Sequence, residues 1–299
     1  MLVACSGGAD SLALLAATVF EAGDRDWRVV GVVVDHGLQA DSEAHTQRVV
    51  QQMAELGAHE TASVRVSVDA GPAGIEAGAR ESRYAALEQL AAHFSADAVL
   101  LGHTLDDQAE TVLLGLARGS GSRSIAGMRQ GFSVFRRPLL SLRRAETEAA
   151  CAALGLDYWV DPHNSDPRFL RASIRHSVMP VLEEQLGPGV ALALARTGTS
   201  VREDLDCLDD LAESAFAGLE LDEGLPVASL TAHPPAIRRR ILRLAALAAG
   251  ALPGELSRER ILAVDALLTD WRGQARIELP GHVGVTRADS RLHFRSPGP

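Results

Sequence analysis

The chain contains no lysine, because all 29 of its lysine-plus-arginine residues are arginines. A GxxxxGK[ST] phosphate loop, a Schiff-base cofactor and a lysine general base are therefore excluded, since each depends on a lysine amine. Any phosphate site in this protein must instead use backbone N–H groups, hydroxyls or guanidinium groups.

Cysteine and long apolar runs are also scarce. The three cysteines, Cys5, Cys151 and Cys207, form no C-x-x-C pair, so the sequence predicts neither a disulfide framework nor a thiolate zinc site. There is no basic-then-apolar leader and no uncharged apolar run of roughly 18 residues. We expect a soluble, cytoplasmic protein with no membrane partner.

Acidic residues outnumber basic ones overall, and the formal net charge is −10. A whole-chain total of this sign usually argues against a nucleic-acid partner, but it does not say where the charges lie. From Arg118 to Arg144 the chain has seven arginines and no acidic residue. This segment predicts a local basic patch.

The first half of the chain alternates short apolar runs with helix-like segments. The apolar runs cover 2–5, 29–35, 64–68 and 98–102. Continuous apolar runs at this spacing are typical of buried parallel strands joined by helical crossovers. We therefore predict an α/β fold with a parallel sheet.

The alternation stops near 161–169, and the second half has a different pattern. A helix interrupted at Pro180 is followed by a long helical region to about 218. The last segment combines two helix candidates with three strands of alternating pattern near 275–280, 282–287 and 291–295. The predicted organisation is a catalytic domain over 1–183, a helical linker over 184–218 and a smaller α+β domain over 219–299.

A glycine pair follows the first apolar run, in "SGGADS" (6–11). Ligands of an open parallel sheet bind at the carboxyl ends of its strands. Gly7 and Gly8 allow a tight turn whose N–H groups, with the positive end of the next helix and the hydroxyls of Ser6 and Ser11, favour phosphate. The alternative is a plain turn in which Asp10 or Ser11 only caps the helix.

Three carboxylates follow the fourth apolar run, in "GHTLDDQAET" (102–111). If Thr104 begins a helix, then His103, Asp107 and Glu110 fall near one face. Crowded carboxylates need a cation, such as Mg²⁺ or the ammonium group of an amine substrate. The alternative is that Thr104 and Asp107 form a capping box and the acidic residues only complement the helix dipole.

Two further stretches carry candidate site residues. Asp35 and His36 end the second apolar run, where either could face a nucleotide. Glu76, Arg80, Arg83 and Tyr84 are spaced to share one helical face. The alternative for that face is a salt-bridged surface exposed to solvent.

Together these stretches resemble the PP-loop ATP pyrophosphatase superfamily, whose S-G-G-x-D-S loop matches Ser6 to Ser11. Within it, the chain resembles the tRNA(Ile)-lysidine synthase family, whose successive motifs match "VDHGLQADSEAH", "EAGARESRYAAL", "GHTLDDQAETVLLGLARGSGSRSIAGM", "RRPLL" and "DPHNSDPRFLRASIRHSVMPVLE". The module that follows in that family resembles "WRGQARIELPGHVGVTRADSRLHF". The resemblance covers nearly the whole chain.

This resemblance implies a ligase that acts on tRNA with ATP and Mg²⁺. Such an enzyme adenylates C2 of the wobble cytidine, position 34, of the CAU-anticodon tRNA(Ile) and releases pyrophosphate. L-lysine then displaces AMP and gives lysidine. The implied partners are that tRNA, L-lysine and ATP, and the resemblance leaves a homodimer open.

The resemblance also implies roles for individual residues. ATP and pyrophosphate binding is expected from Ser6, Gly7, Gly8, Ala9, Asp10, Ser11, His36 and His103. Catalytic roles are expected for Asp35, Asp106, Asp107 and Glu110, with Mg²⁺ at Asp10 and Asp107. Contacts to tRNA are expected from Arg80, Arg83, Arg118, Arg123, Arg171 and Arg175.

Other functions of this superfamily fit the sequence less well. A tRNA thiolase of the 2-thiocytidine type typically uses cysteines in a C-x-x-C pair, which this chain lacks. An amidotransferase-type synthetase needs a glutamine-hydrolysing domain, for which no length remains. A non-catalytic nucleotide-binding or tRNA-binding protein would not need the motif carboxylates, and all of them are present.

Overall fold

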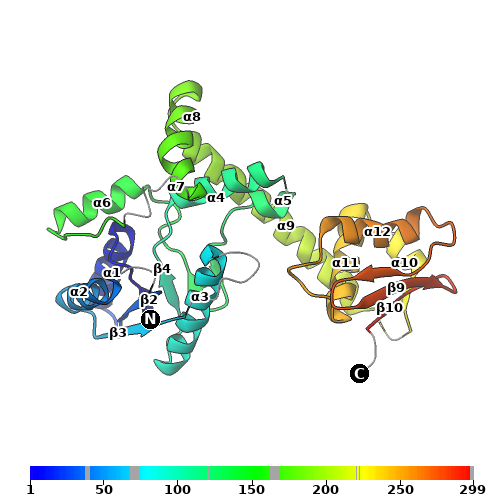
Figure 1. Ribbon diagram of the computed structural model, residues 1–299, viewed down its shortest axis with the longest axis horizontal. Helices are drawn as coiled ribbons and strands as arrows, with labels where there is room; N and C mark the ends of the chain where they lie inside the picture. The colour runs from blue at the N-terminus through cyan, green and yellow to red at the C-terminus, as the bar shows by residue number, and fades with distance from the viewer. Residues whose placement is uncertain are drawn as a thin grey trace. The chain divides into compact units, whose positions relative to one another are not determined.

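The computed structural model separates the chain into two compact units, Met1–Arg202 and Glu203–Pro299, each with its own hydrophobic core (Figure 1). The residues that the structure describes are 1–37, 41–67, 75–119, 121–161, 169–219, 221 and 223–296, with the side chains of 75–77 outside this description.

The first unit is built on a six-stranded sheet. Its strands are β1 (Leu2–Ala4), β2 (Val30–Asp35), β3 (Glu60–Arg65), β4 (Val99–Leu101), β5 (Gly131–Phe132) and β6 (Phe135–Arg136). Their order across the sheet is β3-β2-β1-β4-β6-β5, and every neighbouring pair is parallel except β5 with β6. The predicted α/β fold with a parallel sheet is confirmed.

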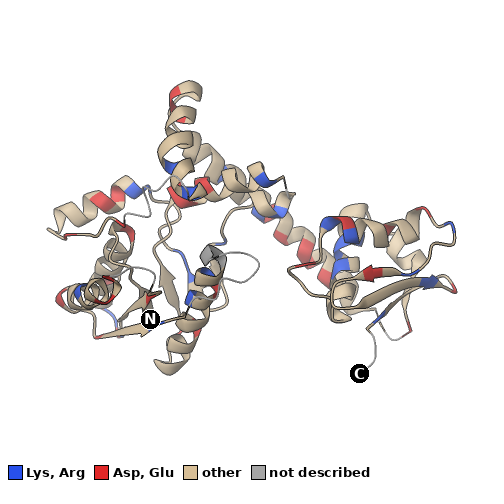
Figure 2. Ribbon diagram, in the orientation of Figure 1, with Lys and Arg blue, Asp and Glu red and all other residues tan. Residues whose placement is uncertain are grey.

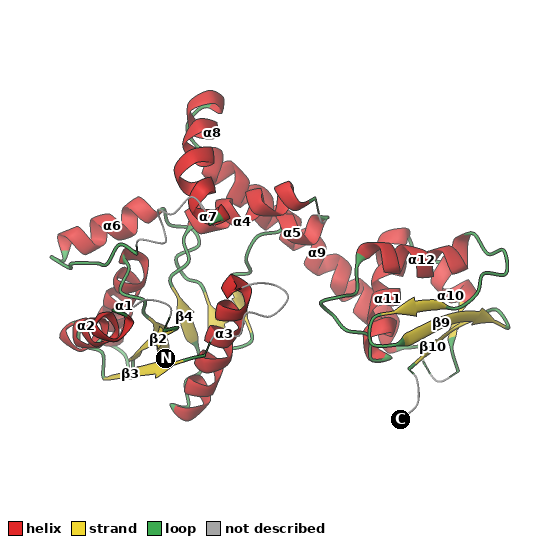
Figure 3. Ribbon diagram, viewed as in Figure 1, coloured by secondary structure: helices red, strands yellow, loops and turns green. Residues whose placement is uncertain are grey.

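Helices cover both faces of this sheet (Figure 3). One face packs against α1 (Ala9–Ala22), α2 (Ser42–Glu55) and α6 (Arg144–Ala153), and the other packs against α3 (Ile75–His93). The strands supply both cores because successive side chains point to opposite faces. Val33 accordingly lies in the core with α1 and α2, whereas Val32 lies in the core with α3.

The strand order reverses at β1, which pairs with β2 on one side and β4 on the other. The segments that follow β1 and β4 meet at this switch point. A Cβ atom added to Gly102 would lie only 3.0 Å from the backbone oxygen of Asp10. The absence of a side chain at Gly102 thus lets the loop after β1 contact the segment after β4.

Two details of the first unit differ from the sequence prediction. The third strand is Glu60–Arg65 rather than 64–68, because β3 is an edge strand that pairs along its full length with β2 while exposing polar side chains. The predicted interruption at Pro180 falls just before that residue, since Pro180 lies in the first turn of α8 (Met179–Leu186). A π-helix, Ile174–Val178, follows α7 (Leu170–Ser173) and accommodates the missing proline N–H before α8 begins.

The remaining helices of the first unit are α4 (Leu105–Arg118), α5 (Ser122–Ile125) and the first part of α9 (Val190–Ala217). The Glu183 carboxylate caps the N-terminus of α9, because it accepts hydrogen bonds from the N–H groups of Gly189, Val190 and Ala191. The boundary between the two units falls inside α9, within the segment 184–218 that the sequence predicts as a linker.

The second unit combines the second part of α9 and three further helices with an antiparallel sheet. The further helices are α10 (Val227–Thr231), α11 (Pro235–Ala248) and α12 (Arg258–Thr269). The strands are β7 (Leu225–Pro226), β10 (Arg291–Arg295), β9 (Val283–Ala288) and β8 (Ile277–Leu279), in that order across the sheet. The predicted α+β module with a small antiparallel sheet is confirmed. Among the described residues, no helix is long and apolar enough to cross a membrane.

Candidate active site

The loop after β1 presents backbone N–H groups at the start of α1. Gly7 has a φ of +82°, a left-handed conformation that favours glycine. Gly8 is the N-cap of α1 and makes no side-chain cap, so neither Asp10 nor Ser11 begins the helix. Within the described residues, neither the Gly7 nor the Gly8 N–H donates to a backbone oxygen, and the Gly7 N–H lies beside the Cys5 thiol.

The Ser11 hydroxyl stabilises this loop through two hydrogen bonds to its backbone. Its Oγ donates to the Gly8 oxygen at 2.9 Å and accepts from the Ser6 N–H at 3.1 Å. The Ser6 hydroxyl lies 3.4 Å from the same Oγ. The loop is therefore a preformed concavity of N–H and hydroxyl donors, the arrangement that binds phosphate at a helix N-terminus.

A cavity of about 610 Å³ extends from this loop across the carboxyl ends of the strands. Its lining includes the loop residues Ser6, Gly8, Ala9, Asp10 and Ser11, then Asp35 and His36 after β2, His103 and Asp107 after β4, and Arg83, Arg144, Arg175 and Trp159. Residues predicted from three separate motifs thus face one space.

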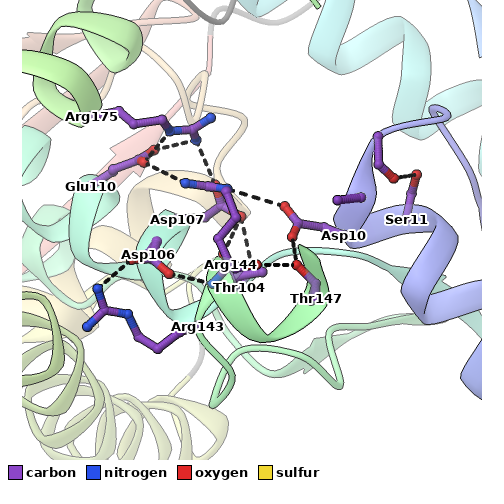
Figure 4. Close-up of polar contacts among 12 residues, drawn as sticks. Asp10, Ser11, Thr104, Asp106, Asp107, Glu110, Arg143, Arg144, Thr147 and Arg175 are labelled. Carbon is purple, nitrogen blue, oxygen red and sulfur yellow. Dashed lines mark hydrogen bonds and ion pairs between the residues drawn. The ribbon is translucent and has the colours of Figure 1, made fainter. Parts of the chain in front are cut away.

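Three carboxylates, which we call the acid cluster, share the same guanidinium group: Asp10 and Asp107, which line the cavity, and Glu110, which does not (Figure 4). Arg144 reaches all three, with its nitrogen atoms 3.5 Å from Asp10 Oδ2, 2.7 Å from Asp107 Oδ1 and 3.6 Å from Glu110 Oε1. Arg175 lies 2.7 Å from Glu110 Oε1 and 3.1 Å from Asp107 Oδ1. Three carboxylates against two guanidinium groups leave one negative charge.

Asp107 also caps its own helix. Its Oδ2 accepts from the N–H of Thr104 at 2.9 Å and from the Thr104 hydroxyl at 3.1 Å, which completes a capping box for α4. The capping role and the site role therefore fall on different oxygens of one carboxylate, because Oδ1 meets Arg144 and Arg175.

The two aspartates of the acid cluster have opposite pKa shifts. Burial raises the pKa of Asp10 despite the hydrogen bond from Thr147 and the charge of Arg144. Burial acts in the same direction on Asp107, but Arg144, the Thr104 N–H, His103 and Arg175 outweigh it and lower the pKa of Asp107. Asp107 is therefore the more firmly ionised of the two.

Asp106 faces a different partner from its neighbour. Its Oδ2 accepts from the backbone N–H of Arg144 at 2.7 Å, and its Oδ1 lies 3.1 Å from an Arg143 nitrogen. The side chain does not line the cavity. These contacts hold the start of α6 in place. Of the three carboxylates predicted from this motif, Asp106 therefore lies apart from Asp107 and Glu110.

Asp35 and His36 lie at the end of β2 but are used differently. The carboxylate of Asp35 accepts from the Gly37 N–H at 2.8 Å and from Arg65 Nε at 2.9 Å, which ties the strand end to β3. Burial raises the pKa of Asp35, but these donors outweigh it and lower the pKa overall. His36 faces the cavity, and its Nδ1 is buried without a partner among the described residues.

Three arginines surround the Tyr84 ring. Arg137 donates to the Tyr84 hydroxyl at 2.9 Å, Arg80 donates to it at 3.3 Å, and Arg83 lies 5.9 Å from the ring centroid. No carboxylate pairs with these three arginines among the residues that the structure describes. Burial, followed by the like charges of Arg80, Arg171 and Arg137, lowers the pKa of Arg83. This arginine cluster therefore favours an anionic ligand.

Two residues of the site were not assigned from the sequence: Arg144, which links the acid cluster, and Arg137, which donates to His103 Nδ1 at 3.2 Å. Both belong to the basic run 118–144. Arg137 is buried and Arg144 is mostly buried, so the predicted basic patch is only partly on the surface. The lack of acidic residues in that run could have indicated this role, because its arginines must pair with carboxylates from other parts of the chain.

The other predicted residues have varied positions. Arg118 and Arg123 are exposed at the end of α4 and in α5. Arg171 donates to the Thr111 hydroxyl at 3.2 Å, and Arg175 belongs with the acid cluster. The Glu76 side chain lies outside the described residues. Within the described part of the chain, no three His, Cys, Asp or Glu side chains are grouped to hold a metal.

We expect His103 to make the protein sensitive to mild acid. Burial lowers the pKa of His103 to about 3, although Asp107 acts in the opposite direction. The unfolded chain takes up this proton near pH 6.5 and the folded chain does not, so stability is complete above pH 6.5 and declines as the pH falls. At pH 5 the loss is about 2 kcal/mol. Urea unfolding between pH 7 and 5 should show a smaller decline for His103→Gln than for the wild type, and equal slopes would contradict this assignment.

The fold and the lysine-free phosphate loop define a PP-loop protein. The family model described as PP-loop domain matches residues 1–182, and the model described as TilS substrate binding domain matches residues 225–293. The chain is 51% identical to tRNA(Ile)-lysidine synthase of Streptomyces coelicolor over 99% of its own length and 85% of that protein, and 53% identical to the enzyme of Mycolicibacterium paratuberculosis over 93% and 85%. The chain belongs to the tRNA(Ile)-lysidine synthase family.

A solved structure shares the fold. The U34-tRNA thiolase NcsA from Methanococcus maripaludis, determined with its [4Fe-4S] cluster, superposes with a TM-score of 0.57 at 18% identity over 68% of this chain and 72% of that chain. At this identity the likeness concerns the fold alone. In our chain Cys5 and Cys151 are buried and Cys207 is exposed.

Proposed function

We propose that this enzyme adenylates the wobble cytidine of the CAU-anticodon tRNA(Ile) and joins L-lysine to it in the cytoplasm. The observation that carries the proposal is that one cavity is lined by a phosphate loop, by two carboxylates of an acid cluster with one uncompensated negative charge, and by the edge of an arginine cluster. These are the three charge environments that ATP, a lysine ammonium group and a nucleotide require.

In the first step, the C2 oxygen of the cytidine attacks the α-phosphate of ATP and pyrophosphate leaves. The phosphate loop would bind the pyrophosphate portion through the N–H groups of Gly7 and Gly8 and the Ser6 hydroxyl. His36 and His103 line the same cavity. Since the loop is preformed, its donors stabilise the leaving group without reorganisation.

Asp10 and Asp107 fit the magnesium ion that such an ATP reaction needs. They lie on either side of one Arg144 guanidinium, so their oxygens already converge on a cation position. Mg²⁺ is commonly held by one or two carboxylates together with substrate phosphates. We assign the ion to Asp10, which borders the loop, with Asp107 as the second candidate, and when bound it would neutralise charge on the pyrophosphate.

In the second step, the bound lysine ε-ammonium group transfers a proton to a carboxylate of the acid cluster, the resulting amine attacks C2 and AMP leaves. Asp107 and Glu110 would hold the lysine ammonium group, because the two guanidinium groups leave one charge of the acid cluster unmatched. Glu110 is 2% exposed, so it acts on the ligand through Arg175 and Arg144 as well as by its own charge. Most of the catalysis would then be positioning and charge stabilisation.

The tRNA would reach this cavity across exposed and half-buried arginines of the first unit. Arg80 and Arg83 lie nearest to the cavity, and Arg118, Arg123 and Arg171 lie along α4, α5 and α7. The second unit matches a substrate binding domain and would supply further tRNA contacts. A homodimer remains a prediction.

The test is mass spectrometry of nucleosides from CAU-anticodon tRNA(Ile) after incubation with the protein, ATP, Mg²⁺ and L-lysine. We expect a lysine-sized mass increase on the wobble cytidine, and none in the reaction without lysine. A sulfur-sized increase on supplying a sulfur donor would instead favour a thiolase. Release of AMP and pyrophosphate without tRNA would favour a nucleotide-binding protein that modifies no RNA.

We expect the double variant Arg118→Gln/Arg123→Gln to bind tRNA more weakly while its KM for ATP stays unchanged. Both side chains are exposed and distant in sequence from the phosphate loop. Each lost phosphate contact reduces the slope of log affinity against log salt by about one, so the double variant should lose about two. Filter binding at several salt concentrations measures this slope, and an unchanged slope would remove these arginines from the tRNA surface.

A further inference from the structure

One face of α2 packs against the phosphate loop, and His45 on this face also lines the cavity. His45, Val49 and Gln52 share this face because they are spaced four and three residues apart. The His45 Nε2 atom lies 3.0 Å from the Ser6 carbonyl oxygen. Val49 fills the space beside Gly7, where an added Cβ would lie 2.6 Å from its Cγ2. Gln52 donates to the backbone oxygen of Asp157 at 2.6 Å.

That last contact positions Trp159, which reaches the same loop. The backbone N–H of Trp159 donates to the Gly7 carbonyl oxygen at 2.8 Å. The centroid of the Trp159 ring lies 4.0 Å from that of the His45 ring, and the two ring planes are tilted by 39°. The carbonyls of two successive loop residues, Ser6 and Gly7, are therefore each held by a donor from outside the loop. Neither donor has a role in the steps proposed above.

The orientation of these carbonyls decides where the phosphate-binding N–H groups point. In a trans peptide the C=O and the N–H of one unit point in opposite directions. The Ser6 carbonyl shares its peptide unit with the Gly7 N–H, and the Gly7 carbonyl shares its unit with the Gly8 N–H. Holding both carbonyls toward His45 and Trp159 therefore turns both N–H groups to the opposite side, where neither donates to a backbone oxygen among the described residues. Gly8 lines the cavity there, and the Gly7 N–H lies beside the Cys5 thiol.

We propose that His45 and Trp159 are positioning residues that set the orientation of the phosphate loop for the pyrophosphate portion of ATP. The inference rests on the proposed assignment of ATP to this loop. Since the Ser6 carbonyl can only accept, His45 Nε2 carries the hydrogen, and Nδ1 is buried without a partner among the described residues. The imidazole therefore acts as a donor through Nε2, and an amide of similar reach can replace it.

The test compares His45→Leu, which removes the donor, with His45→Gln, which keeps an N–H at similar reach. We expect His45→Leu to raise the KM for ATP about tenfold, as expected when an oriented hydrogen bond is lost. Product inhibition by pyrophosphate should weaken by the same factor, whereas inhibition by AMP and the KM values for lysine and tRNA should stay within about twofold. His45→Gln should restore most of the ATP affinity.

Two further variants separate orientation from general stability. Gln51→Ala lies on the exposed side of α2, where Gln51 pairs only with Glu55, and should behave as wild type. Trp159→Leu keeps its backbone donor but loses the ring against His45, so it should weaken pyrophosphate inhibition about threefold. Equal pyrophosphate inhibition in His45→Leu and wild type, or equal weakening in His45→Gln and His45→Leu, would overturn the proposal.

Direct binding separates this proposal from the proposed function. Isothermal titration of the purified protein with ATP and with pyrophosphate needs neither tRNA nor lysine. If no lysidine forms but pyrophosphate binding still depends on His45, the proposed reaction fails and the role of His45 stands. If lysidine forms and pyrophosphate binds equally well to His45→Leu, the reaction stands and the positioning role fails.

Discussion

Asp107→Asn is expected to lower lysine-dependent turnover by about 10³-fold while the chain stays folded. The amide keeps the shape of the side chain and one acceptor for the Thr104 cap, but it removes the charge that Oδ1 presents to Arg144 and Arg175. With that charge gone, the acid cluster has no negative charge left for an ammonium group. Formation of lysidine at saturating lysine measures the loss.

The two half-reactions distinguish the possible roles of Asp107. Pyrophosphate release with tRNA and ATP but without lysine reports adenylation alone, and we expect Asp107→Asn to retain it within about tenfold. If pyrophosphate release were lost as well, Asp107 would be assigned to the magnesium site rather than to lysine binding. Normal lysidine formation would remove Asp107 from the site altogether.

Asp106→Asn is the matched control for this experiment. Asp106 is adjacent in sequence and also pairs with an arginine, but it contacts Arg143 and the Arg144 N–H and does not line the cavity. We expect turnover within about tenfold of wild type, because only the start of α6 is affected. Equal loss in both variants would mean that the acidic motif acts through folding rather than through charge at the cavity.

These carboxylates illustrate what the sequence could predict. The parallel sheet, the glycine loop and the acidic motif follow from local patterns, since each strand and the loop after it are adjacent in the chain. The capping box was also predictable, because Thr104 and Asp107 are three residues apart. The likeness of the motifs to one family then indicated the chemistry.

The counter-charges of the acid cluster were not predictable from spacing. Arg144 and Arg175 pair with Asp107 from 37 and 68 residues away, so no periodicity links them to it. The sequence indicated that crowded carboxylates need a cation, and the fold supplies guanidinium groups from α6 and from the π-helix before α8. Similarly, the donors that hold the phosphate loop come from α2 and from Trp159, far from the glycines that they orient.

Asp265→Ala is expected to destabilise the second unit by about 3 to 5 kcal/mol, because it leaves a buried guanidinium group unpaired. Asp265 is 5% exposed, and its oxygens lie 2.6 Å from Arg238 and 2.8 Å from Arg239. Burial raises the pKa of Asp265, but the hydrogen bonds from these arginines outweigh it and lower the pKa. Calorimetry should show the melting transition of the second unit at a lower temperature.

Asp270→Ala is the matched control within the same unit. Asp270 and Arg272 lie 2.9 Å apart, but their side chains are 60% and 78% exposed, so solvent screens the pair and its loss should cost less than about 0.5 kcal/mol. Equal effects of the two substitutions would show that burial does not govern the Asp265 pair. Both partners of Asp265 belong to the arginines of α11, blue in Figure 2.

The functional consequence of Asp265→Ala tests whether the two units have separate tasks. The phosphate loop and the cavity lie wholly within Met1–Arg202, so ATP and pyrophosphate should bind to the variant with unchanged affinity. If the second unit binds tRNA, lysidine formation should fall at temperatures where that unit is unfolded and recover on cooling.

Arg238→Met combined with Asp265→Leu should regain stability relative to Asp265→Ala, because the buried charge is removed with its partner. Restored stability with restored turnover would assign the defect to folding of the second unit, whereas restored stability without turnover would show that the buried ion pair has a role in tRNA modification beyond stability.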